Sequence, residues 1–188
     1  MTTIKMNATG AQNNESNNGA RQSFVTPFSN DPERYWERPD YTKVIADTAI
    51  NQICGSLKAE HGPMWPSVLA SWGCVSGTGI TGKLLRWRDM PALALHVSGY
   101  KHTGWVIVSL NEGADVYELE LADEQMFAIE GSRLEEVYFD ELGPKIDAMV
   151  ETGGNEDEYN KQVEQDPANA DIIALRKRFP NAKQVVVL

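Results

Sequence analysis

A glycine-rich segment, residues 77–83, carries the first spacing in this chain that suggests chemistry. Gly77, Gly82 and Lys83 match the G-x-x-x-x-G-K pattern, in which backbone N–H groups wrap a phosphate and the lysine reaches it. The next residue is Leu84, where a Ser or Thr hydroxyl should bind Mg²⁺, and Pro91 would end any helix that followed. We therefore interpret the segment as a flexible connector between a helix and a sheet.

Cysteine and histidine residues are the next candidates, as metal ligands or as catalytic groups. The chain has two cysteines and three histidines, and their spacings match none of the paired patterns of metal sites. Cys74 could meet His96 or His102 as a nucleophile beside a base, but no helix N-terminus is placed at Cys74 to lower its pKa. We expect no metal and no cofactor, and we favour a protein that is not an enzyme.

Basic and aromatic residues gather in two segments, at Arg86 and Arg88 and at Tyr100, Lys101 and Trp105. Such residues are typical of proteins that bind single-stranded nucleic acid, because bases stack on the rings while cations track the phosphates. Packing of the rings in the core is the competing interpretation. Single-stranded nucleic-acid binding is therefore an alternative function, and the formal net charge of −10 opposes it.

The acidic residues are concentrated in one stretch. Residues 112–166 contain 18 Asp or Glu residues and only three basic residues, whereas the rest of the chain is mildly basic. A local acidic field attracts cationic surfaces and repels nucleic acid and anionic membranes. Regularly spaced carboxylates can also imitate a phosphate backbone, as they do in small inhibitor proteins from mobile elements. A solvated acidic face that only keeps the protein in solution is the ordinary alternative.

The favoured hypothesis is a small non-enzymatic interaction protein that binds a protein partner with a basic surface, in the manner of a bacterial or phage accessory or inhibitor protein. Strand alternation places Glu118 and Glu120 on one face, which we expect to be exposed. Glu135 and Glu136 are the nearest acidic pair in the sequence. These four glutamates are the predicted partner-binding residues.

The periods of the apolar residues define the elements that must position these groups. Apolar residues recur at helical spacing in residues 42–57 and again in residues 140–152. Between them, residues 84–122 form three apolar or alternating runs separated by turn-forming residues, which predicts an antiparallel meander. Residues 83–88 and 136–139 are candidates for one more strand on either side. The predicted fold class is α+β, an antiparallel sheet of three to five strands packed against two main helices.

Composition suggests the limits of the domain. Residues 1–37 begin with a stretch rich in Asn, Gly and Ser, and we predict a disordered or irregular N-terminal tail. Residues 38–152 are predicted to form the α+β domain, and residues 153–188 an acidic linker with a C-terminal helix. The N-terminus lacks a signal-peptide pattern, no apolar run is long enough to span a bilayer, and two cysteines are too few for a disulfide framework. We therefore expect a cytoplasmic protein without membrane contact.

Overall fold

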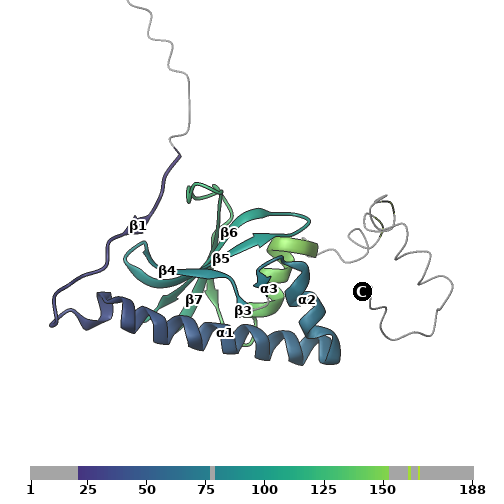
Figure 1. The fold of residues 1–188 in the computed structure, drawn as a ribbon, viewed down its shortest axis with the longest axis horizontal. Helices are drawn as coiled ribbons and strands as arrows, with labels where there is room; N and C mark the ends of the chain where they lie inside the picture. The colour runs from purple at the N-terminus through teal and green to yellow at the C-terminus, as the bar shows by residue number, and fades with distance from the viewer. Residues whose placement is uncertain (1–20, 77–78, 153–160, 162–164, 166–188) are drawn as a thin grey trace, which may run out of the picture.

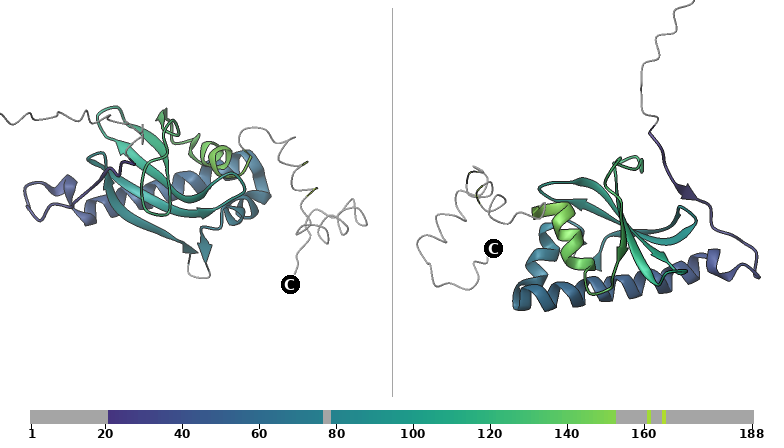
Figure 2. Two further views of the ribbon diagram at one scale, coloured as in Figure 1. Left: turned by 90° about the horizontal axis from the view of Figure 1, so that it is seen from above. Right: turned by 180° about the vertical axis from the view of Figure 1, so that it is seen from behind.

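The computed structural model describes residues 21–76 and 79–152, together with Lys161 and Gln165 (Figure 1). Most of the predicted N-terminal tail, two residues of the glycine-rich segment, and nearly all of the predicted acidic linker and C-terminal helix lie outside the described residues. In the described part, one long helix crosses one side of an antiparallel sheet (Figures 1 and 2).

An antiparallel sheet of six strands forms the centre of the fold. Its order is β1-β4-β5-β6-β7-β8. The strands are β1 (Val25–Thr26), β4 (Gly82–Trp87), β5 (Met90–Ser98), β6 (Thr103–Asn111), β7 (Val116–Ala122) and β8 (Leu134–Val137). The predicted α+β class is confirmed, but the sheet has more strands than the three to five predicted. The additional strand is β1, which pairs with the outer edge of β4.

The central strands β5 and β6 are buried along almost their whole length. Their side chains alternate between two apolar clusters, so that Leu95 and Val106 belong to one cluster while Ala94 and Ile107 belong to the other. Because both faces of these strands are apolar, both faces of the sheet need cover.

Within the described residues, helices cover one face of the sheet. Helix α1 (Pro39–His61) has a proline in its first turn and buries Ala46, Ala49, Ile53 and Leu57 against the first cluster. The shorter elements are η1 (Tyr35–Glu37), η2 (Gly62–Met64), α2 (Trp65–Ser71), α3 (Leu142–Asp147) and the π-helical turn η3 (Ala148–Thr152). Both predicted helices are therefore present, the first longer than residues 42–57. Within the described ranges, no helix is long and apolar enough to cross a bilayer.

A close approach between α1 and α3 fixes the C-terminal end of the helical layer. The N–H of Gly143 donates to the Ser56 hydroxyl at 2.9 Å, and a Cβ on Gly143 would lie only 2.5 Å from Leu57 Cγ. Trp72, which follows α2, donates its indole N–H to Asp147 of α3 at 2.8 Å. Glycine at position 143 is therefore a packing requirement.

On the opposite side of the sheet no helix of the described residues packs, and we call this side the helix-free face. It is the side that bears Leu85, Trp87, Ala92, Ala94, Trp105, Ile107 and Ala122. Phe24 from the N-terminal segment, and Met126 and Ala128 from the loop between β7 and β8, pack on it. Figures 1 and 2 show the N-terminal segment, in purple, passing the β4 edge of the sheet on its way to α1. Residues 21–26, predicted as part of the tail, thus pack on the sheet.

Two glycines on the facing helices provide a matched pair of substitutions. Gly143→Ala forces α3 away from α1, so we expect it to lower the free energy of unfolding by about 1–3 kcal/mol. A Cβ on Gly55 meets no atom within 4 Å, so Gly55→Ala should raise the free energy of unfolding by roughly 0.5–1 kcal/mol. Urea denaturation measures both changes, and equal effects of the two substitutions would contradict this packing.

Candidate functional site

Glu118 and Glu120 lie on the helix-free face of β7, side by side as the alternation predicts. They are nevertheless buried, with 8% and 6% of their surface exposed, so the predicted exposure is wrong. The reason is that β7 is an interior strand, between β6 and β8, and that arginines from the β4–β5 turn and from the loop before β8 cover both carboxylates.

Both glutamates are held by several donors. Arg88 donates Nε and Nη2 to the two oxygens of Glu120 at 2.9 and 2.8 Å, and the Trp87 indole N–H donates at 2.6 Å. Burial raises the pKa of the Glu120 carboxyl, but the hydrogen bonds from Arg88 and Trp87 outweigh it, so this pKa lies below its ordinary value. Glu118 accepts from Nη2 and Nε of Arg133 at 2.6 and 3.1 Å. Both carboxylates are therefore engaged in hydrogen bonds and ion pairs within the fold.

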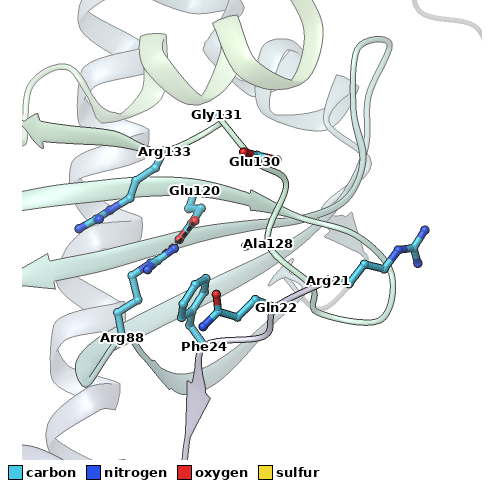
Figure 3. A pocket seen from close by; sticks show the side chains of 9 residues that line it. All are labelled: Arg21, Gln22, Phe24, Arg88, Glu120, Ala128, Glu130, Gly131 and Arg133. Carbon is cyan, nitrogen blue, oxygen red and sulfur yellow. Dashed lines mark hydrogen bonds and ion pairs between the residues drawn. The ribbon is translucent and has the colours of Figure 1, made fainter. Parts of the chain in front are cut away.

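A pocket of about 580 Å³ lies beside the Arg88–Glu120 pair, and Figure 3 labels the nine residues that line it. The Arg88 guanidinium stacks on Phe24, with Cζ 3.3 Å from the ring centroid, and points toward Glu120 (Figure 3). The N–H of Arg88 donates to the carbonyl of Phe24 at 3.0 Å, and the N–H of Ala128 donates to the carbonyl of Gln22 at 2.9 Å. These contacts fasten the N-terminal segment to the sheet.

The arginines of this pocket are already paired with carboxylates. The pairs are Arg88–Glu120, Arg133–Glu118, Arg133–Glu135 and Arg21–Asp123. Because each guanidinium faces a carboxylate, the pocket presents no net positive charge to a phosphate or another anion. The contacts of this pocket hold residues 21–26 on the helix-free face.

The residues of the nucleic-acid hypothesis lie at two ends of the sheet. Arg86 lies near the end of β4 and Arg88 lies in the β4–β5 turn, whereas Tyr100 and Lys101 lie in the β5–β6 turn. The nine residues of β5 separate these turns by roughly 25 Å. The two groups therefore do not form one continuous surface.

Three of these five side chains are also engaged inside the fold. Arg86 is buried and donates to the backbone carbonyl of Asp89 at 2.7 Å, and Arg88 belongs to the buried pair described above. Trp105 is only 7% exposed, and Nζ of Lys83 lies 4.4 Å from its ring centroid. Stacking of a base on Trp105 would require this cover to move.

Glu135 and Glu136, by contrast, are exposed on β8, the last strand in the order of the sheet. The chain then continues through Tyr138 and Phe139, which are 57% and 59% exposed, to an exposed Asp140. We call these five residues the β8 edge patch. Sequence reasoning assigned the two aromatic residues to a possible strand and missed their exposure, because no pattern in residues 136–139 distinguishes a presented ring from a buried one.

The chemical centres that we considered from the sequence have little support in the geometry. Burial raises the pKa of the Cys74 thiol to about 11, so the reactive thiolate is scarce at neutral pH. Gly82 begins strand β4, so the G-x-x-x-x-G-K spacing does not lead into a helix N-terminus. In residues 21–76 and 79–152, no cluster of three or more His, Cys, Asp or Glu residues is arranged to hold a metal ion.

Similarity to other proteins gives no direct guide to function. Comparisons of the chain with known protein families, with curated proteins and with solved structures find no match. The function is therefore argued from the surfaces of the chain. Two of the four predicted partner-binding glutamates remain on such a surface, in the β8 edge patch.

The buried Glu120 makes stability depend on pH. Because its folded pKa lies below the ordinary value of 4.5, its stabilising effect is present above that value and is lost as the pH falls through the folded pKa. Glu120→Gln leaves Arg88 without its counter-charge, and we expect it to lower the free energy of unfolding at neutral pH by about 3 kcal/mol.

Denaturation at neutral pH and at about pH 3 measures this dependence, since the difference from the wild type should shrink in acid. Glu135→Gln is the matched control, because its pair with Arg133 is exposed and should contribute well under about 1 kcal/mol. A difference for Glu120→Gln that stays constant between the two pH values would rule out the proposed cause.

Proposed function

We propose that this chain is a non-enzymatic binding protein that holds a protein partner with a basic surface against the β8 edge patch, in the manner of an accessory or inhibitor protein. The observation that carries the proposal is the exposure of Tyr138 and Phe139 beside Glu135, Glu136 and Asp140. We therefore propose binding at the edge of the sheet and not at the centre of β7, whose two glutamates are buried.

Tyr138 and Phe139 supply the apolar part of this surface. Aromatic residues are enriched at protein–protein interfaces and carry much of the binding energy there, because a partner removes their rings from water. Val137 and Leu142, on either side of the exposed residues, are buried in the first cluster. The backbone is therefore anchored at both ends, and the two rings are presented at a fixed place.

The carboxylates around the rings select the partner. Glu135, Glu136 and Asp140 lie beside the rings, in a chain whose formal net charge is −10. Exposed charges act over about 8–10 Å at physiological salt, so they attract a basic surface and repel nucleic acid and anionic lipid. This favours a basic protein as the partner.

The state of the cysteines supports a cytoplasmic location. Cys54 and Cys74 are the two cysteines of the sequence, and both are free thiols. Unpaired cysteines are usual in reducing compartments. A protein partner in the cytoplasm is therefore the first to seek.

Single-stranded nucleic-acid binding has weaker support. Its residues lie at two ends of β5, and Arg86, Arg88 and Trp105 are engaged within the fold. Tyr100 and Lys101 remain exposed at the β5–β6 turn, but two residues offer a small surface for a strand of nucleic acid.

Charge reversal at the edge patch tests the proposed function. We expect the tagged wild-type chain to capture a basic protein from a lysate of its source organism at low salt. Glu135→Lys combined with Glu136→Lys should reduce this capture by about tenfold or more, because the attractive charges become repulsive. Quantitative mass spectrometry of the eluates measures the change.

Glu33→Lys combined with Glu60→Lys is the matched control, since it adds the same charge at two exposed positions outside the edge patch. Capture by this control should stay near the wild-type level. Equal losses in both variants would show that only total charge matters, and the proposal would then fail. Nuclease-sensitive nucleic acid in the eluate, without a protein, would favour the alternative function.

A further inference from the structure

A groove of about 350 Å³ lies next to the β8 edge patch, between α1 and the residues that enter α3. Its walls include Gln52, Gly55, Ser56 and Ala59 from α1, and Phe139 and Asp140 from the edge patch. The volume is at the low end of the roughly 300–1,000 Å³ of ligand pockets, which suits one extended side chain. Because groove and patch share two residues, a partner on the patch reaches the groove.

Small residues on α1 keep the groove open. Gly55 and Ala59 are one helical turn apart on the same face, and a Cβ on Gly55 would meet no atom within 4 Å. The Ser56 hydroxyl is already used, because it donates to the carbonyl of Ile53 at 3.0 Å and accepts from the N–H of Gly143 at 2.9 Å. The floor is therefore an apolar channel suited to methylene groups.

The carboxylate of Asp140 is exposed and borders this channel. Phe139 adds an aromatic ring, whose face attracts cations. None of the residues that line the groove is basic, so the groove lacks the donor that these groups favour.

We propose that the groove receives one long basic side chain, a lysine or an arginine, from the protein partner. Its methylene groups lie along Gly55 and Ala59, and its charged head donates to Asp140 beside the Phe139 ring. This inference rests on the proposed function, and it specifies that function further, because it names the group by which a basic partner is recognised.

The test uses small probes on the isotope-labelled full-length chain, followed by NMR. The cationic probes are the Nα-acetyl methylamides of arginine and lysine, and the neutral probes are the corresponding derivatives of citrulline and norleucine. We expect saturable shifts at the backbone amides of Gly55, Ala59 and Phe139 with both cationic probes. The neutral probes should bind about fivefold more weakly, as expected for the loss of one exposed carboxylate contact and one cation–π contact.

Variants at the groove separate binding from folding. Gly55→Leu fills the channel, and leucine is the better helix former, so this variant should lose the shifts while remaining at least as stable as the wild type. Gly55→Ala adds only a methyl group and should retain most of the binding. Asp140→Asn removes the carboxylate contact alone, so it should weaken the cationic probes about twofold to threefold and leave the norleucine probe unchanged, whereas Glu33→Gln, at another exposed position, should change neither.

The outcomes separate this inference from the proposed function. If the groove amides do not respond, or respond equally to norleucine, the proposal that the groove receives a basic side chain is overturned. This holds even where charge reversal at Glu135 and Glu136 abolishes partner capture. If the cationic probes bind but charge reversal leaves capture unchanged, the proposed function fails and the groove site stands. Groove shifts that depend on protein concentration alone would assign the groove to a second copy of the chain and would also overturn the inference.

Discussion

Strands β5 and β6 carry apolar side chains on both faces, and the rest of the structure depends on covering them. Helices α1 and α3 cover one face, with Ile53 and Leu57 in the core. Within the described part of the chain, the other face has no helix. Phe24 and the loop between β7 and β8 cover it, and two arginine–glutamate pairs close the remaining area. The glutamate of each pair is buried, so removal of its arginine would leave a buried charge without its counter-ion.

This cover also explains where charge is available for binding. Arg133 and Arg88 lie 15 and 32 residues from the glutamates that they neutralise, and the sequence alone does not place them there. Alternation therefore predicted the shared face of Glu118 and Glu120 but not its burial. The count of carboxylates in residues 112–166 overstates the acidic surface, and the exposed remainder of the predicted set lies at β8.

The regular elements were predictable where one period dominates, as in residues 42–57 and 84–122. In these segments the spacing of the apolar residues matches the repeat of the helix or of the strands. Strand β1 was not predictable, since its pairing uses backbone groups and its side chains carry no pattern. The β4–β5 turn was not predictable either. Its residues Arg88 and Asp89 have φ of 51° and 64°, and the turn lacks the glycine or asparagine that marks such turns. Of the four candidate glutamates, Glu135 and Glu136 are exposed, but the groove beside Phe139 depends on how α3 meets α1, which no local pattern encodes.

Strand β8 is a poor template for another strand. It has four residues, its register with β7 shifts between its two pairs, and Glu136 has a φ of 56°. A short, kinked strand that bears two carboxylates resists continuous pairing with a strand from another chain. The molecule therefore displays two aromatic rings at the end of its sheet while the strand beside them is poorly suited to pair with a strand from another chain.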